Sequence, residues 1–187
     1  MGEKVTPVVD LNEAAALSEG RHANPFAFLG PHPDGKGWRV TVWQPGAERL
    51  RLEPGGEAVA VPGFPGLFTG RTTTREYRLI AEGHGATWEL DDPYRFGPVM
   101  GEIDEYLLGE GTHRRLWDVL GAHRMTHDGV DGTHFAVWAP NAQRVSVVGD
   151  FNLWDGRRNP MRLRGATGVW EIFLPGVTAG TSYKYEI

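Results

Sequence analysis

The sequence contains no cysteine, so disulfide bonds and thiolate metal sites are excluded. It has no apolar run approaching the roughly 20 residues of a membrane-spanning helix, and its first ten residues carry no apolar signal segment. It also lacks an excess of positive charge: 19 Lys and Arg face 24 Asp and Glu, a net charge of -5. We therefore expect neither nucleic acid nor membrane as a partner. A chain without cysteine suits the reducing cytoplasm, which is the location we expect.

Glycine and proline are abundant, with 26 and 13 of the 187 residues. Such a composition is typical of many short elements joined by tight turns. Between these turns lie short runs in which apolar and polar residues alternate, the pattern of half-buried strands. The composition and the runs together predict an all-β protein. The strand-like runs are residues 38–45, 49–53, 75–82, 86–90, 134–139, 145–149, 169–174 and 183–187.

An internal repeat indicates that this all-β protein has two similar parts. Residues 37–52 and 132–147 align without a gap at an offset of 95, with identical residues at Gly37/Gly132, Val42/Val137, Trp43/Trp138, Pro45/Pro140, Ala47/Ala142 and Arg49/Arg144. Tyr77 matches Tyr183 at an offset of 106, so the second copy has gained eleven residues in between. Ile187 then corresponds to Ala81. We expect two tandem immunoglobulin-like β-sandwiches, the second incomplete because it has no counterpart of residues 82–96.

Two further segments are predicted to be helical, and residues 21–37 are expected to form an ordered loop packed by Phe26, Phe28 and Leu29. Residues 10–19 begin with two possible N-caps, Asp10 and Asn12, and read as one short helix that ends at Gly20. Apolar residues between 102 and 120 have helical spacing, interrupted by glycine. The expected order is therefore an N-terminal helical segment, a first sandwich, a helical connector and a second sandwich, at residues 1–20, 21–101, 102–128 and 129–187.

The candidate binding site is the loop DFNLWDG, residues 150–156, which follows a predicted strand. A tryptophan ring can stack on the apolar C–H face of a sugar, and the neighbouring Asp150, Asn152 and Asp155 can hydrogen-bond its hydroxyls. The loop falls within the interval that only the second copy has gained, so the shared sandwich does not need it. An alternative is that Trp154 simply plugs one end of the sandwich.

Other constellations favour structural roles. The adjacent acids Asp91 and Asp92 precede a proline and are more typical of a turn cap than of a catalytic pair. His123 and His127 lack an evident third ligand, so no metal or other cofactor is expected. Trp43 and Trp138 occur in both copies, which favours packing, or cover for the sheet where it meets another domain.

Several motifs resemble the amino-terminal region of bacterial 1,4-α-glucan (glycogen) branching enzymes. They are NPFAFLGPH, DDPYRFGPVMGEIDEYLLGEGTHRRLWDVLGAH, FAVWAPNAQRVSVVGDFNLWDGRRNPM and the YKYEI strand. The segment FAVWAPNA…GDFN.W by itself resembles carbohydrate-binding modules of family 48. The resemblance implies a first β-sandwich and then a truncated binding module, with a catalytic (β/α)₈ barrel as the partner that follows Ile187. It implies transfer of α-1,4-glucan chains to 6-hydroxyls, with no catalytic residue in the present sequence.

The resemblance also implies sugar-binding roles for two residues of this sequence. Trp154 matches the loop aromatic that stacks on glucose, and Lys184 matches the lysine of the Y-K-[FY] strand that hydrogen-bonds sugar hydroxyls. The first copy has Arg78 in place of this lysine. The expected glucan-binding residues are therefore Trp154, Lys184, Asn152 and Asp155, with glycogen and malto-oligosaccharides as ligands. The alternative function is a structural or assembly module of another α-amylase-superfamily enzyme, without glucan binding of its own.

Overall fold

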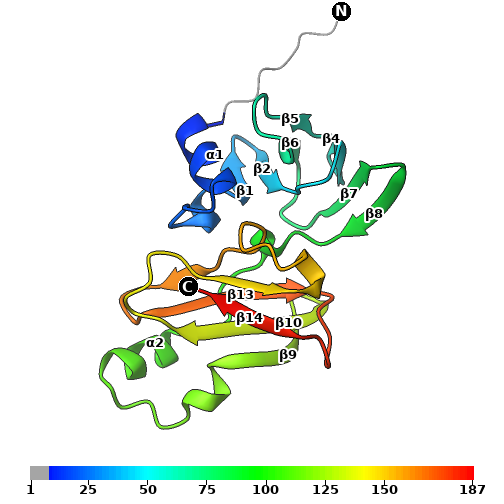
Figure 1. The fold of residues 1–187 in the computed structure, drawn as a ribbon. Coiled ribbons are helices and arrows are strands. Elements are labelled where there is room, and N and C mark those ends of the chain that lie inside the picture. Colours follow the sequence, from blue (N-terminus) through cyan, green and yellow to red (C-terminus); the bar gives the residue numbers. More distant parts are fainter. Residues whose placement is uncertain (1–8) are drawn as a thin grey trace, which may run out of the picture. The chain divides into compact units, whose positions relative to one another are not determined.

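The computed structural model describes residues 9–187, which divide into two compact units (Figure 1). Unit 1 contains the described residues up to Glu19 and Phe28–Arg95, and unit 2 contains Gly20–Ala27 and Phe96–Ile187. Most regular structure in both is β-strand, which confirms the predicted all-β class. In the described part of the chain, no helix is long and apolar enough to cross a bilayer.

Unit 1 begins with helix α1, Leu11–Ser18, whose N-cap Asp10 accepts a hydrogen bond from the amide of Asn12. Two four-stranded antiparallel sheets follow, with the strand orders β1-β2-β6-β5 and β4-β3-β7-β8. The strands are β1 Gly30–Asp34, β2 Gly37–Trp43, β3 Arg49–Glu53, β4 Gly56–Glu57, β5 Val59–Ala60, β6 Leu67–Thr72, β7 Arg78–Gly83 and β8 Ala86–Leu90. A short 3-10 helix, η2 (Pro93–Arg95), ends the unit.

The core of unit 1 follows from the period-2 pattern of its strands. In β3, Leu50 and Leu52 are buried while the three charged residues between and beside them are exposed. Val40 of β2, Phe68 of β6 and Leu79 of β7 meet them in one apolar cluster. Because alternate residues of a strand point to opposite faces, each sheet contributes one apolar face to a core between the two.

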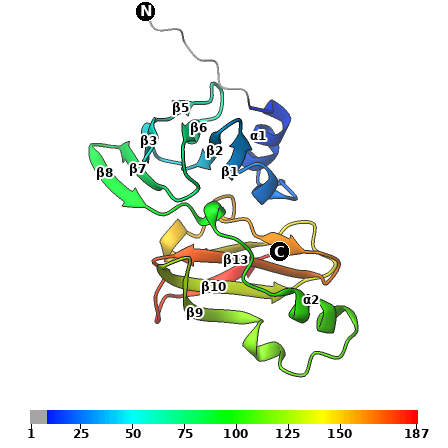
Figure 2. The ribbon, with the colours of Figure 1, turned by 180° about the vertical axis from the view of Figure 1, so that it is seen from behind.

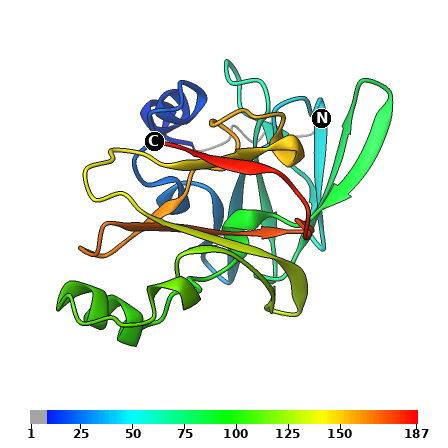
Figure 3. The same ribbon diagram turned by 60° about the horizontal axis from the view of Figure 1, so that its bottom comes forward.

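Unit 2 is also built of two sheets, one of four strands in the order β12-β13-β10-β9 and one of two strands, β11 and β14 (Figures 2 and 3). Its elements are η1 Pro25–Ala27, α2 Glu102–Gly109, η3 Leu116–Asp118, β9 Gly121–His127, β10 Val130–Trp138, β11 Ser146–Gly149, η4 Asp150–Asn152, β12 Arg162–Arg164, β13 Val169–Pro175 and β14 Tyr183–Glu186. Phe135, Val147 and Ile172 are at most 1% exposed and lie in its core.

Two predictions about local structure are corrected. The expected helical connector 102–128 is helical only in its first part, because Gly121–His127 forms strand β9 and pairs with β10. The expected ordered loop 21–37 contains β1, Gly30–Asp34. Two prolines are tolerated in this strand because it lies at the edge of its sheet, where a missing amide hydrogen breaks no ladder. The domain boundaries drawn from the sequence stay a prediction.

The structure extends the internal repeat to the helices. At an offset of 91, α1 coincides with α2, η1 with η3, and the first residue of β1 with that of β9. The histidines of the two copies make the same contact: Nε2 of His32 lies 3.1 Å from the carbonyl of Leu29, and Nε2 of His123 lies 3.0 Å from that of Leu120. Helix α2 is therefore the second copy's version of α1. The offset becomes 95 because the β9–β10 hairpin is longer than the β1–β2 hairpin by four residues.

Two repeated glycines have a packing reason. A Cβ atom on Gly37 would lie 2.8 Å from the carbonyl oxygen of Thr72, and one on Gly132 would lie 2.4 Å from that of Leu174. In each copy the central strand therefore approaches the backbone of its neighbour too closely for any side chain.

Asp92 caps a turn, the role that its position before Pro93 predicted. Its buried carboxylate accepts hydrogen bonds from the amide of Tyr94 at 2.9 Å and from the hydroxyl of Tyr77 at 2.6 Å. Burial raises the pKa of Asp92 to about 6, although these hydrogen bonds and the charge of Arg95 act in the opposite direction. Burial, with the neighbouring Asp92, also raises the pKa of Tyr77 above its usual value, so its hydroxyl stays a donor.

The stability of unit 1 should therefore fall between about pH 4 and about pH 7. The pKa of Asp92 is higher in the folded state than its ordinary value of 3.8, so the folded chain binds this proton more tightly. The proton's stabilising contribution, about 3 kcal/mol, is present below the unfolded pKa and lost as the pH rises through the folded pKa. Urea unfolding across this range should show the loss, and Asp92→Asn should remove it. An unchanged pH profile in Asp92→Asn would contradict the assignment.

Candidate functional site

The loop after β11 displays two apolar side chains in an unusual backbone conformation. Leu153 and Trp154 follow η4, both have φ of 59°, and their exposed fractions are 74% and 43%. A left-handed conformation costs on the order of 1 kcal/mol at a residue other than glycine and persists only where the surroundings enforce it. The amide of Trp154 bonds to the carbonyl of Gly149 at 2.9 Å, which closes the loop back onto the end of β11.

The Trp154 ring is held in a defined orientation. Its Nε1–H donates to Oδ1 of Asp150 at 2.8 Å, and Nζ of Lys184 lies 6.0 Å from the ring centroid, near the outer limit of a cation–π contact. Lys184 comes from β14, where it pairs with Val148 of β11. The fold therefore brings together Trp154 and Lys184, which are 30 residues apart in sequence. The exposure of the ring does not fit a plug at the end of the sandwich.

Asn152 lies inside the loop, with an exposed fraction of 4%. Its Nδ2 donates to the carbonyl of Val147 at 2.9 Å and to Oδ1 of Asn159 at 2.8 Å, while its Oδ1 accepts from the amide of Gly149 at 2.9 Å. Its polar atoms therefore tie the two ends of the loop to β11. Because Asn152 is buried and its polar atoms already have partners, we interpret it as a residue that positions Trp154 and not as one that contacts the sugar directly.

Asp155 is held by the arginine two residues later. Its carboxylate accepts two hydrogen bonds from the Arg157 guanidinium, at 2.9 and 2.8 Å, and a third from the Arg157 amide at 3.0 Å. The Arg157 hydrogen bond is the main reason that the pKa of Asp155 lies below its usual value. The carboxylate is thus charged at neutral pH and already has partners.

Arg144 and Ser146 hold the end of the loop at Gly156. The hydroxyl of Ser146 donates to the carbonyl of Gly156 at 2.5 Å, and Nη1 of Arg144 donates to the same carbonyl at 2.9 Å. Arg144 also forms an ion pair with Glu186 of β14. The role of Arg144 in the loop was not predicted, because the first copy has the same residue, Arg49, and a shared residue indicated a role in the common sandwich.

An open depression adjoins the loop. It has a volume of about 560 Å³ and is lined by Asp150 and Phe151 on one side and by residues of the β13–β14 connection on the other, namely Pro175, Gly176, Val177, Ala179, Gly180 and Thr181. Asp150 therefore both orients the Trp154 ring and borders a space large enough for sugar residues beside it.

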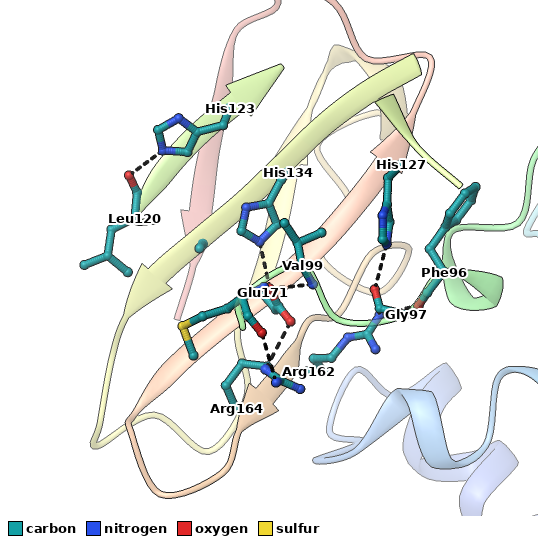
Figure 4. Close-up of polar contacts among 12 residues, drawn as sticks. Phe96, Gly97, Val99, Leu120, His123, His127, His134, Arg162, Arg164 and Glu171 are labelled. Carbon is teal, nitrogen blue, oxygen red and sulfur yellow. Dashed lines mark hydrogen bonds and ion pairs between the residues drawn. The ribbon is translucent and has the colours of Figure 1, made fainter. Parts of the chain in front are cut away.

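A second polar cluster in unit 2 surrounds the carboxylate of Glu171 (Figure 4). His134 Nε2 lies 2.8 Å from Oε2 of Glu171, and these residues are 3% and 1% exposed. The same Oε2 accepts from the amide of Met100 at 2.9 Å, and Oε1 lies 3.2 Å from Nε of Arg164. Burial alone would raise the pKa of Glu171, but the hydrogen bonds from His134 and Met100 and the nearby positive charges hold it below its usual value. A carboxylate enclosed in this way has a structural role.

The two histidines of β9 contact backbone carbonyls. His123 and His127 lie on β9, where each contacts a backbone carbonyl, of Leu120 and Gly97 respectively. Over residues 9–187, no group of three or more His, Asp or Glu side chains could hold a metal ion.

Two family models match this chain, each over a different segment. Residues 10–94 match the family model described as "alpha-1,4-glucan branching enzyme GlgB, N-terminal domain", and residues 119–187 match "Carbohydrate-binding module 48 (Isoamylase N-terminal domain)". The second match begins within the η3–β9 region, which agrees with β9 being part of the second sandwich.

Curated relatives match almost the whole chain. It is 57% identical to "1,4-alpha-glucan branching enzyme GlgB" of Roseobacter denitrificans over 96% of this chain and 26% of the relative. The proteins of the same name from Rhizobium meliloti and Paramagnetospirillum magneticum are 52% and 53% identical, each over 94% of this chain and over 25% and 24% of the relative. The chain spans about a quarter of the length of these relatives. The chain therefore corresponds to an N-terminal region of these branching enzymes, with the GlgB N-terminal domain at residues 10–94 and a family 48 carbohydrate-binding module at residues 119–187.

Proposed function

We propose that this chain is the non-catalytic, α-glucan-binding portion of a glycogen branching enzyme, and that it binds glucan at Trp154 and Lys184. The observation that supports this most is the display of the Trp154 ring, which is exposed in a left-handed conformation, tethered to Asp150 and close to the Lys184 ammonium. A loop that served only packing would not need an exposed aromatic ring in a costly conformation.

The site suits a neutral sugar chain. Glucose is uncharged and cannot form ion pairs with the protein. An apolar platform therefore supplies much of the contact, and polar groups set the orientation. The Trp154 ring provides the platform, the Lys184 ammonium can donate to hydroxyls, and the depression beside Asp150 can accept the next sugar residue. In this proposal Asn152 and Asp155 shape the loop through their contacts with Val147 and Arg157.

In the longer relatives, the name 1,4-alpha-glucan branching enzyme describes the whole protein. We infer that the chemistry, transfer of α-1,4-glucan chains to form α-1,6 branches in glycogen biosynthesis, requires the catalytic barrel expected to follow these sandwiches. In this proposal the present chain keeps glucan near that barrel. It contributes no catalytic residue. Its cytoplasmic location stays a prediction.

Trp154→Ala should weaken binding of maltoheptaose about thirtyfold, since truncating a central aromatic anchor costs about 2 kcal/mol. Lys184→Ala should have a smaller effect, about 1 kcal/mol, the size of one hydrogen bond. The measurement is a titration followed by NMR chemical shifts. Leu153→Ala is the matched control, because Leu153 shares the loop, the exposure and the backbone conformation but offers no ring. Unchanged affinity in a folded Trp154→Ala protein would place the site elsewhere.

A further inference from the structure

The sequence contains four Asp–Gly pairs, and the structure places them in different surroundings. They are Asp34–Gly35, Asp128–Gly129, Asp131–Gly132 and Asp155–Gly156. An aspartate followed by glycine readily rearranges to isoaspartate, because glycine has no side chain to hinder attack by its own amide nitrogen. Within a folded protein, the reaction depends on the freedom of the carboxyl group and on the space around the glycine.

The rearrangement changes the course of the main chain without changing its composition. The glycine nitrogen attacks Cγ of the protonated aspartic acid. A C–N bond forms, the C–OH bond breaks, and water leaves with the amide proton. Water then adds to the main-chain carbonyl of this succinimide, and the C–N bond at that carbonyl breaks. The chain now runs through Cγ with one additional methylene, and the α-carboxyl is free.

The pair Asp131–Gly132 is protected by packing and by a hydrogen bond. Gly132 is buried, and a Cβ atom on it would overlap the carbonyl of Leu174, so there is no room for the succinimide ring. The Asp131 carboxylate accepts a hydrogen bond from the hydroxyl of Thr126 at 2.5 Å. Both features hold this pair in its normal form.

The pair Asp155–Gly156 is protected in the same two ways. Gly156 is buried, and a Cβ atom on it would overlap the carboxylate of Glu186. The Asp155 carboxylate accepts hydrogen bonds from the Arg157 guanidinium at 2.9 and 2.8 Å. The Arg157 hydrogen bond also holds the pKa of Asp155 below its usual value, so the protonated form that the reaction needs is scarce.

The other two pairs lie at the β1–β2 and β9–β10 hairpins, one in each copy of the repeat. A Cβ atom on Gly35 or on Gly129 would meet nothing within 4 Å, so both glycines have open space. The Asp34 carboxylate, however, forms an ion pair with Arg71 at 2.7 Å. Asp128 is exposed, and within the described range 9–187 its carboxylate has neither a hydrogen bond nor an ion pair. The reactive pair is therefore held in the first copy and free in the second.

We propose that Asp128–Gly129 is the site at which the folded chain forms isoaspartate, ahead of its three other Asp–Gly pairs. The hairpin itself explains why this pair is present. His127 and Val130 are paired, which leaves a two-residue turn with φ of 47° at Asp128 and 76° at Gly129. Turns with positive φ at both central residues strongly favour Asn–Gly and Asp–Gly. The residues that best form the turn are thus also the ones that rearrange.

The modification should loosen the end of β9. A tight two-residue turn cannot hold an additional methylene and keep His127 opposite Val130. His127 would then leave its position, where Nε2 lies 3.2 Å from the carbonyl of Gly97 and the ring centroid lies 5.3 Å from that of Phe173. Because β9 is an edge strand, no second neighbour replaces the pairing that is lost.

The test is prolonged incubation of the folded 187-residue chain, followed by peptide mapping with tandem mass spectrometry. An isoaspartyl O-methyltransferase, which moves a labelled methyl group from S-adenosylmethionine to the free α-carboxylate, measures the total amount. Isoaspartate should be about tenfold more abundant at Asp128 than at the other three positions, because those react only after local opening. In urea, all four positions should react at similar rates, since their protection comes from the fold.

Two variants test the explanation. Arg71→Ala should raise isoaspartate at Asp34 about threefold, the modest effect expected for an exposed ion pair, and should leave Asp128 unchanged. Asp128→Glu should remove the product at this position, because the longer side chain would have to close a larger ring.

Three results would overturn the proposal. They are equal amounts at the four positions of the folded chain, less product at Asp128 than at Asp34, and no change at Asp34 in Arg71→Ala. The last result would show that a held carboxylate is not what protects the first hairpin. None of these measurements depends on whether Trp154 binds glucan.

Discussion

Glu171→Ala should destabilise unit 2 by about 3–5 kcal/mol, the range measured when one partner of a buried ion pair is removed. The Glu171 carboxylate is 1% exposed and has four partners. It accepts hydrogen bonds from the amides of Val99 and Met100 and contacts the His134 ring. It also forms an ion pair with the Arg164 guanidinium. Alanine would leave these four groups without the carboxylate in a place that water cannot easily reach. The cost arises mainly from the groups left behind.

The measurement is native-state amide exchange of the β10 and β13 strands, which are the centre of the four-stranded sheet. Glu89→Ala is a matched control, because Glu89 also pairs with an arginine, Arg78, but with both side chains more than half exposed. Exposed ion pairs contribute about 0–1 kcal/mol, so the control should change little. Equal, small effects of the two substitutions would show that the Glu171 cluster does not hold the sheet together.

Gly132→Ala should be nearly as damaging, at about 3 kcal/mol, the upper part of the range for overpacking a core. The added methyl carbon would lie 2.4 Å from the carbonyl oxygen of Leu174 and 2.6 Å from the Phe173 ring. The carbonyl belongs to the β10–β13 ladder, so it cannot move without breaking strand pairing. Neither contact can be relieved by rotating a flexible side-chain end.

Gly129→Ala provides the comparison, because a Cβ atom there meets nothing within 4 Å. Its φ of 76° still adds a backbone cost on the order of 1 kcal/mol, so this variant measures strain without overlap. In urea unfolding, Gly132→Ala should have a clearly smaller free energy of unfolding than Gly129→Ala. The explanation by close approach fails if the two variants unfold at the same urea concentration.

The sequence predicted the sandwiches because their strands obey a simple rule. Alternation in β3, with Leu50 and Leu52 inward, is set by which face is apolar. The same rule missed β1, whose prolines are tolerated only because it lies at an edge. An edge position depends on the whole sheet and cannot be read from five residues.

The candidate site was predicted in part. Trp154 and Lys184 do lie together, and the family resemblance had named both. The inward direction of Asn152 was not predictable, because it results from the tight turn through Leu153 and Trp154. The role of Arg144 was hidden because its hydrogen bonds reach Ser146, Gly156 and Glu186 only after the loop folds back over β11 and β14.

The repetition of helix, hairpin and central strand has a consequence for how the chain acquires its structure. Two neighbouring segments with similar strands can exchange partners during folding, and tandem similar domains are prone to such misassembly. The strands β2 and β10 share residues at equivalent positions, so either could pair with the neighbour intended for the other. The four additional residues of the β9–β10 hairpin and the inserted loop shift the second copy out of register with the first. These length differences act against pairing between strands of different copies. Deleting the additional residues should increase the fraction of chains that refold with strands of one copy paired to strands of the other.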